Sequence, residues 1–384
     1  MSDKYIITDK LIGKGGFGYV YIAYEKNSID KKYAAKEIDF KKLKEEQKKN
    51  SENEEDEKEE NDSNKKNIKD MNDVLNKTVI ELNNEVSILL EFNNKNLVKL
   101  YDIISRENSL SLILEYSNGG DLLNIHKKWT EKNGKNVLPE NIIRKIIKDV
   151  LNGLSCLHRN YIIHHDIKLQ NILVFFDNEE DLNNLNLLKA TYKLTDFGLS
   201  QYYVDLKNVQ FGGTIDYFPY EIIKYCYDKK NKSNEYSKED FKKYLQSDKI
   251  DMFAIGILVY KLLFFSNPFM SNKSSKINTI LKNFNEDLFK NLPIYLTKRK
   301  KISKEILVFL DTLLKKDPQK RYSSELSEYS RFLTRKYKDF HWIDKNNIDE
   351  INIDNHVKTD SEGYIMIDMS VDKYLKDYDV FEDY

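Results

Sequence analysis

The chain has 384 residues, 40% of them hydrophobic and 12% aromatic, which is enough for one large domain or two smaller ones with a buried core. Charged residues make up 33%, yet the formal net charge is only −1, so we expect no nucleic-acid ligand. The two cysteines exclude a disulfide framework and favour a reducing, cytoplasmic setting. We find no signal peptide and no apolar run of about 20 residues that would span a membrane.

Two strands joined by a glycine turn are predicted from Tyr5 to Glu25, because Val20, Ile22 and Tyr24 recur at every second position. A third strand is predicted at "KKYAAKEIDF". Residues 41–75 are almost entirely Lys, Glu, Asp, Asn and Ser, and such a stretch cannot bury enough apolar surface to fold. We therefore interpret residues 41–75 as a low-complexity insertion.

After the insertion the pattern changes from helix to strands and then to helices. Apolar residues at helical spacing in "TVIELNNEVSILLEF" predict a helix, and "LVKLYDII" and "LSLILEYS" predict strands. Further helices are predicted at residues 142–157, 249–263 and 304–315. A small β-rich part followed by a larger helical part indicates an α+β fold with two lobes.

The glycine-rich stretch "GKGGFGYV" occupies residues 13–20. Glycines at positions 13, 15 and 18 allow the backbone to approach a phosphate group closely. Dinucleotide-binding folds share this spacing, but there a helix follows the glycines, whereas here an alternating strand follows. The flanks therefore favour a β-hairpin that covers a phosphate, with an ordinary glycine turn as the alternative.

Lys36 lies in the predicted strand "YAAKEI", where a fixed cation can neutralise phosphate oxygens. A lysine on a solvated strand edge is the alternative interpretation. The phosphate role needs an acidic partner on a nearby helix. Glu85 fits this place, and Glu81, one helical turn earlier, is the competing residue.

Four polar residues in two short stretches carry the chemistry. In "YIIHHDIKLQNIL", Asp166 can accept a proton from an attacking hydroxyl, Lys168 can steady a transferring phosphoryl group, and Asn171 can hold a metal ion. In "KLTDFGLS", Asp196 can bind magnesium between phosphate oxygens. Each residue alone could be a loop acid or a helix cap, but their joint order and spacing are hard to obtain by chance.

Together these motifs resemble those of the eukaryotic protein kinases. The resemblance includes "GKGGFGYV", "AAK", "HHDIKLQN", "TDFG", "GGTIDYFPYE", "DMFAIG" and "DPQKR". It spans residues 5–337, with an N-lobe at about 5–115 and a C-lobe at about 116–337, and leaves residues 338–384 as an acidic C-terminal extension. It implies a bilobal protein-kinase fold that binds ATP and Mg²⁺ between its lobes and phosphorylates protein hydroxyls.

The resemblance also implies a role for each site residue. At the adenine, Leu114 would be the gatekeeper, and Glu115 and Ser117 would offer backbone groups. Asp121 would face the ribose or the substrate. Asp166 and Lys168 would be catalytic, and Asn171 and Asp196 would hold the metal. The implied ATP-binding set is Gly13, Lys14, Gly15, Gly16, Gly18, Val20, Ala34, Lys36, Glu85, Leu114, Glu115, Ser117, Asp121 and Leu173.

Two supporting features follow from the same resemblance. Glu221 would form a structural salt bridge with Arg321. Asp251 would anchor a stacked column of Leu89, Leu100, His164 and Phe197.

Three positions depart from the family pattern. His165 replaces an arginine that in many members binds a phosphate on the activation segment, Tyr220 replaces a proline, and Phe253 replaces a tryptophan. The arginine does no chemistry, so we predict that catalysis is intact.

The activation segment offers few places for a phosphate. Between Gly198 and Thr214 the only hydroxyl residues are Ser200, Tyr202 and Tyr203, none of them in the middle of the segment. We therefore predict activity without an activating phosphate and without these three hydroxyls.

Lys168 together with Thr214 resembles serine/threonine kinases, while a tyrosine-directed kinase and a nucleotide-binding scaffold without turnover are the competing classes. The stretches "DIKLQNIL", "FFDNEEDLNNLNLLKATYK" and "SELSEYSRFLTRKYKDF" resemble protist members of the unc-51-like, autophagy-initiating branch. A calcium/calmodulin-type or unplaced kinase is the alternative.

The extension contains one further motif. In residues 360–367, acids precede Tyr364 and Ile367, a pattern similar to peptides that bind ubiquitin-like autophagy modifiers as an added strand. The alternative is a strand that packs on the chain's own C-lobe.

Overall fold

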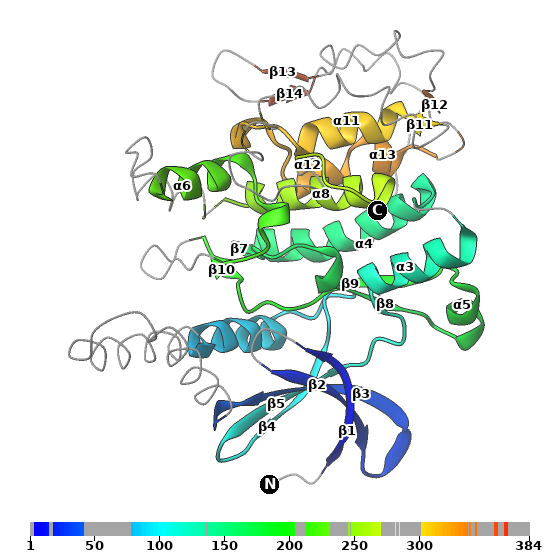
Figure 1. Ribbon diagram of the computed structural model, residues 1–384, viewed down its shortest axis with the longest axis vertical. Coiled ribbons are helices and arrows are strands. Elements are labelled where there is room, and N and C mark those ends of the chain that lie inside the picture. Colours follow the sequence, from blue (N-terminus) through cyan, green and yellow to red (C-terminus); the bar gives the residue numbers. More distant parts are fainter. Residues whose placement is uncertain are drawn as a thin grey trace, which may run out of the picture.

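The computed structural model describes residues 4–14, 18–41, 78–134, 137–203, 212–230, 245, 247–269, 281, 284, 301–336, 338, 342–343, 357–359 and 365–367. The predicted insertion, apart from its first residue, lies outside the described residues, as do Gly15, Gly16 and most of the C-terminal extension. The described residues form two lobes, a smaller one rich in strands and a larger one rich in helices (Figure 1).

The smaller lobe is an antiparallel sheet of strand order β1-β2-β3-β5-β4. Its strands are β1 (Tyr5–Lys14), β2 (Tyr19–Glu25), β3 (Ser28–Asp39), β4 (Leu100–Ser105) and β5 (Ser109–Glu115). The strands predicted on both sides of the insertion are thus confirmed.

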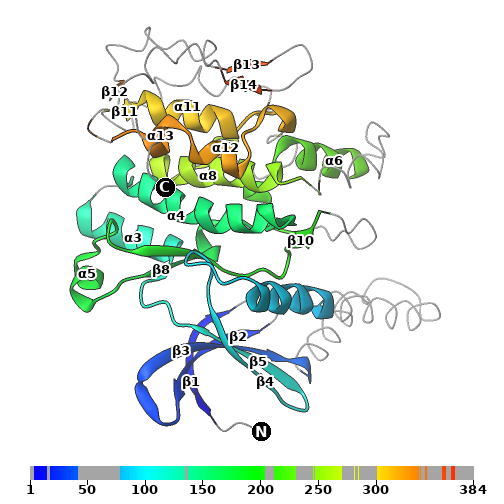
Figure 2. The ribbon, with the colours of Figure 1, turned by 180° about the vertical axis from the view of Figure 1, so that it is seen from behind.

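Residues 78–91 form the helix that was predicted after the insertion. Its apolar face, with Leu82, Ile88 and Leu89, is buried in the main core. The helix lies between the sheet and the larger lobe, as the two opposite views in Figures 1 and 2 show. It can therefore present polar residues to both lobes.

The larger lobe is built around two helices, α4 (Glu140–Arg159) and α8 (Lys249–Phe264). Helix α8 is buried on nearly every side, as expected for a helix with apolar residues all round. The three predicted C-lobe helices are confirmed with slightly different ends. The lobe also contains α3 (Leu122–Asn133), α5 (Glu179–Asn184), α6 (Tyr220–Lys230), α11 (Lys304–Leu313), α12 (Ser324–Glu328) and α13 (Arg331–Thr334).

Two small sheets bring the chemical motifs together. One has the order β6-β8-β9, and in the other β7 pairs with β10. The loop between β7 and β8 contains Asp166, and the loop between β9 and β10 contains Asp196. Because β8 pairs with β9 and β7 pairs with β10, the two loops are flanked by paired strands, and these residues lie at one site. The strands are β6 (Gly120–Asp121), β7 (Ile162–Ile163), β8 (Ile172–Phe175), β9 (Thr191–Leu194) and β10 (Gln201–Tyr202).

Two further strand pairs involve the C-terminal part. Strand β11 (Ile302–Ser303) pairs with β12 (Trp342–Ile343). Strand β13 (Val357–Thr359) pairs with β14 (Ile365–Ile367). Within the parts of the chain described above, no helix is long and apolar enough to cross a membrane.

Candidate active site

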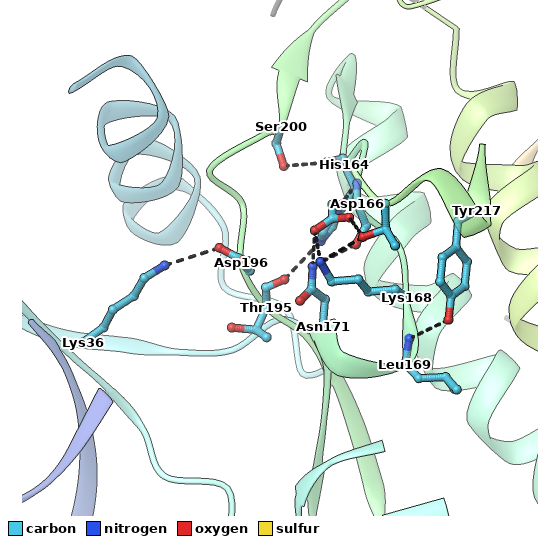
Figure 3. A network of polar contacts seen from close by, with 11 residues as sticks. Lys36, His164, Asp166, Lys168, Leu169, Asn171, Thr195, Asp196, Ser200 and Tyr217 are labelled. Atoms are coloured by element: carbon cyan, nitrogen blue, oxygen red, sulfur yellow. Dashed lines mark hydrogen bonds and ion pairs between the residues drawn. The ribbon is translucent and has the colours of Figure 1, made fainter. Parts of the chain in front are cut away.

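Lys36 extends from β3 to two carboxylates. Its Nζ lies 2.6 and 2.7 Å from the two carboxylate oxygens of Glu85. It also lies 3.3 Å from Oδ1 of Asp196, a contact drawn in Figure 3. Burial alone would disfavour the ammonium, but these carboxylates raise the pKa of Lys36 above its ordinary value. Lys36 therefore stays charged, and its ion-pair partner is Glu85 and not Glu81.

Asp166 is the centre of a dense hydrogen-bond network (Figure 3). Its Oδ2 accepts from Lys168 Nζ at 2.5 Å and from Asn171 Nδ2 at 2.9 Å. Its Oδ1 accepts from Thr214 Oγ1 at 3.1 Å, and Lys168 Nζ also contacts that hydroxyl at 3.2 Å. These donors hold the Asp166 carboxylate in one position, as a residue that must meet a substrate hydroxyl requires.

The backbone beside Asp166 is fixed by Asp251 of α8. The N–H groups of His164 and His165 donate to its two carboxylate oxygens, at 2.7 and 2.9 Å. The His164 ring packs against the Phe197 ring, with centroids 5.4 Å apart. Leu89 belongs to the same core as Phe197, and the partly buried Leu100 packs against that core. The predicted anchor is confirmed. Since nearly every residue of α8 is buried, the loop that contains Asp166 is attached to the core of the larger lobe.

Asn171 and Asp196 present oxygens suited to a magnesium ion. The Asn171 amide nitrogen donates to the backbone oxygen and Oδ2 of Asp166, both at 2.9 Å, so its Oδ1 is the atom left to face a cation. Burial raises the pKa of Asp196, but the Lys36 charge outweighs it and holds that pKa below its usual range. A carboxylate and an amide oxygen match the hard oxygen ligands that Mg²⁺ prefers.

The segment predicted to hold adenine is fastened to β8. The Ser117 hydroxyl lies 2.6 Å from the Val174 carbonyl oxygen, and Asn118 exchanges two hydrogen bonds with the backbone of Phe176, at 2.8 and 2.9 Å. The two carboxylate oxygens of Glu115 accept hydrogen bonds from Lys193 Nζ, at 2.8 and 2.7 Å. Side chains thus hold the predicted adenine segment in place, while the Glu115 N–H donates to the Lys99 carbonyl oxygen at 2.9 Å.

The other predicted adenine-site residues lie around this segment. Leu114 is buried on β5 beside Ala34 of β3, and both belong to the main core. Val20 and Leu173 are partly buried against it. Asp121 caps helix α3, where its Oδ1 accepts the Asn124 N–H at 2.9 Å.

Gly13 and Lys14 end β1, and Gly18 precedes β2. A Cβ at Gly18 would lie 1.9 Å from the Glu37 carbonyl oxygen, so no larger residue fits there. Gly15 and Gly16 lie outside the described residues.

His165 does not behave as a substitute for a cationic arginine. Its side chain is buried, and its Nε2 has no hydrogen-bond partner within the described parts of the chain. Burial lowers the pKa of His165 to about 4. The ring is therefore neutral near pH 7 and offers no charge to a phosphate.

The predicted salt bridge between Glu221 and Arg321 is confirmed. Arg321 donates to both carboxylate oxygens of Glu221, at 2.7 and 2.8 Å, and is completely buried. Tyr220 opens helix α6 directly before Glu221, so the replacement of proline leaves the salt bridge intact.

Three contacts near the site were not foreseen. They are the Lys193–Glu115 ion pair, the Asn118 bonds to Phe176, and a hydrogen bond from the Tyr202 hydroxyl to Glu91 Oε2 at 2.9 Å. All join residues far apart in the sequence. No local spacing rule would have found them.

Comparison with known proteins gives a consistent result. The protein kinase domain model matches residues 55–333, which is more than half of the chain. The match begins after the glycine-rich loop and Lys36. The structure connects that first part to the matched part through the contacts of Lys36 with Glu85 and Asp196.

Several protein kinases resemble the chain at low identity. It is 26% identical over 325 residues to serine/threonine-protein kinase ULK3 of Homo sapiens, covering 84% of this chain and 53% of that protein. It is 28% identical over 254 residues to Aurora kinase of Schizosaccharomyces pombe, covering 66% and 58%. It is 24% identical over 320 residues to calcium-dependent protein kinase 6 of Plasmodium berghei, covering 83% and 16%. The chain thus spans less than two thirds of the length of each of these relatives. On the family model's match and the joined site, the chain belongs to the protein kinase domain family.

Proposed function

We propose that the chain is an ATP-dependent protein serine/threonine kinase, which transfers the γ-phosphoryl group of Mg-ATP to protein hydroxyls. One observation carries the proposal. A charged lysine, Lys36, is held by Glu85 and Asp196. Near it (Figure 3), Lys168 and Asn171 of the same loop, and Thr214 from the activation segment, donate hydrogen bonds to Asp166. Phosphoryl transfer depends chiefly on this kind of fixed positioning and charge.

Each residue has a defined task in this proposal. Asp166 orients the acceptor hydroxyl and takes its proton, and Lys168 neutralises charge on the moving phosphoryl group. Lys36 binds the phosphates of the nucleotide. The Asn171 amide oxygen and the Asp196 carboxylate would hold magnesium, which when bound neutralises charge between phosphate groups.

The contact of Thr214 with both Asp166 and Lys168 supports a serine or threonine acceptor.

The competing class is a scaffold that binds nucleotide without turnover. Such a protein usually lacks a residue at the place of Lys36, Asp166 or Asp196, and all three are present and in contact with their partners here.

The test is phosphorylation of generic protein acceptors by the purified full chain with Mg-ATP, followed by identification of the modified residues. The expected products are phosphoserine and phosphothreonine. Phosphotyrosine as the main product would favour the tyrosine-directed class. ATP binding without more transfer than in Asp166→Asn would favour the scaffold.

We further propose a cytoplasmic kinase of the unc-51-like branch. The 26% identity to ULK3 supports this placement, and the identities to Aurora kinase, 28%, and to a calcium-dependent kinase, 24%, are of similar size. Phosphoproteomics of cells with and without the chain tests the proposal. Autophagy-initiation proteins should lead the changed substrates, and their absence from those substrates would contradict it.

We also propose, independently, that the C-terminal extension binds a ubiquitin-like modifier through residues 360–367. Ile367 lies in β14, so this part of the motif already has the extended backbone that strand addition needs, whereas Tyr364 lies outside the described residues. A peptide of residues 358–370 should bind such a modifier with micromolar affinity in calorimetry. Replacing Tyr364 and Ile367 by alanine should abolish binding. No binding by the unchanged peptide would refute the proposal.

A further inference from the structure

The start of the activation segment is fixed to the larger lobe without any phosphate. Strand β10 pairs with β7, and the Tyr203 N–H donates to the Tyr161 carbonyl oxygen at 2.8 Å. The Ser200 hydroxyl donates to the His164 carbonyl oxygen at 3.3 Å (Figure 3). These bonds fix the backbone on both sides of Tyr202 and therefore the position of its side chain.

Tyr202 makes a contact of a different kind, because it reaches the other lobe. Its hydroxyl donates to Glu91 Oε2 at 2.9 Å. Glu91 is the last residue of the helix of residues 78–91, and the same helix carries Glu85. In Figure 1 this helix lies below β10, against the smaller lobe. The activation segment therefore contacts the element that positions the partner of Lys36.

The middle of the activation segment has no residue that could carry a phosphate to make such a connection. Residues 204–211 contain no Ser, Thr or Tyr. His165, where a phosphate-binding arginine would stand, is buried and neutral. Both halves of a phosphate–arginine link are therefore missing at their usual places.

The other two hydroxyls of the segment do not connect the lobes. Ser200 is 1% exposed and bonds within the larger lobe. The Tyr203 ring packs edge-on against Tyr161, and its N–H donates to the Tyr161 carbonyl oxygen, again within the larger lobe. Of the three, Tyr202 is the residue placed to act across the lobes.

We propose that the Tyr202–Glu91 hydrogen bond is a phosphate-independent link that keeps the helix of residues 78–91 where Glu85 meets Lys36. Tyr202 is then a positioning residue. The proposal rests on the kinase activity proposed above and adds a contact that keeps the chain in the active arrangement. It also revises one expectation from the sequence, since we no longer expect all three hydroxyls of the segment to be dispensable.

The experiment compares kinetics of the full-length chain with Tyr202→Phe, Glu91→Ala and the double variant. Loss of one hydrogen bond to a carboxylate should lower kcat about fivefold in each single variant, with KM for the acceptor peptide unchanged. The double variant should be no slower than either single one, because both remove the same bond. Glu91→Gln keeps an accepting oxygen and should retain most of the activity.

Tyr203→Phe is the matched control, since it removes the neighbouring hydroxyl, which does not face the helix, and it should keep the wild-type kcat. Wild-type kcat in Tyr202→Phe and Glu91→Ala would overturn the proposal. So would additive effects in the double variant, or loss of activity after phosphatase treatment.

A second measurement needs no turnover and so separates this proposal from the kinase activity itself. Amide hydrogen exchange in residues 78–91 should become faster in Tyr202→Phe and in Glu91→Ala, but not in Tyr203→Phe. Unchanged exchange would refute the link even in an active enzyme. Faster exchange in a chain without transfer above Asp166→Asn would support the link and refute the proposed activity.

Discussion

Asp166 and His165 are neighbours in the chain and are each 7% exposed, yet their surroundings are opposite. The Asp166 carboxylate accepts hydrogen bonds from Lys168, Asn171 and Thr214. The His165 ring has an Nε2 without a hydrogen-bond partner among the described residues, and its pKa is lowered to about 4. Equal burial therefore has two different effects: the Asp166 carboxylate is held in position by its donors, whereas the His165 ring loses its charge. The residues predicted for chemistry contact one another, whereas the ring at the position of the predicted phosphate-binding arginine carries no charge near pH 7.

The largest effect is expected from the charges that surround the nucleotide phosphates. Lys36→Met and Asp196→Asn should each lower turnover roughly a hundredfold or more, because each removes a charge that the transition state needs. Steady-state kinetics with Mg-ATP and a protein acceptor is the measurement.

Lys32→Met is the matched control for the lysine variant, since Lys32 lies on the same strand with its Nζ 6.0 Å from the Tyr116 ring centre. Its turnover should stay near the wild-type value. Equal losses in Lys32→Met and Lys36→Met would show that the Lys36 position has no special role.

The second effect concerns the pH dependence of stability at His165. Its ordinary pKa is 6.5 and the folded value is about 4, so below the ordinary pKa the unfolded chain binds a proton that the folded chain does not. Stability from this group is complete above the ordinary pKa and is lost as pH falls toward the folded one. Asp251, His164 and His158 also act on the ring, and Asp251 opposes the shift.

Between about pH 7.5 and pH 5 this group should cost the wild type about 2 kcal/mol of unfolding free energy. Urea unfolding at both pH values, for wild type and for His165→Asn, measures the difference. The variant should lose less stability than wild type by about that amount. Equal losses would mean that His165 titrates normally in the folded chain.

The third and smallest effect tests whether the bonds around Asp166 matter individually. Thr214→Val removes a hydroxyl 3.1 Å from Asp166 Oδ1 and should lower kcat about tenfold, the value of one hydrogen bond to a charged group. Thr214→Ser keeps the hydroxyl and should stay within about twofold of wild type. If the two variants behave alike, the hydroxyl does not position Asp166.

Much of this site could be predicted because the motifs resemble those of a family in which the same residues meet. The pairs Lys36–Glu85 and Glu221–Arg321 and the anchor at Asp251 were implied in this way. The choice between Glu85 and Glu81 was less secure, because the two lie one turn apart on the same helix and both are buried. Only the position of the helix against β3 decides between them.

The contacts that could not be predicted depend on how separate elements are oriented. Tyr202 and Glu91 are 111 residues apart, and Lys193 and Glu115 are 78 apart. Neither pair has a local pattern, because each depends on how two elements meet. The sequence showed Tyr202 as one of three hydroxyls in the activation segment, and only the fold shows that it faces Glu91.

Phosphoryl transfer by phosphatase-treated wild-type chain, measured beside Asp166→Asn, tests the central claim most directly. The claim is that the chemistry is intact while control by an activating phosphate is absent. The treated wild type should keep most of its activity and should exceed Asp166→Asn by roughly a hundredfold or more. A treated wild type that transfers no more phosphate than Asp166→Asn would contradict the account.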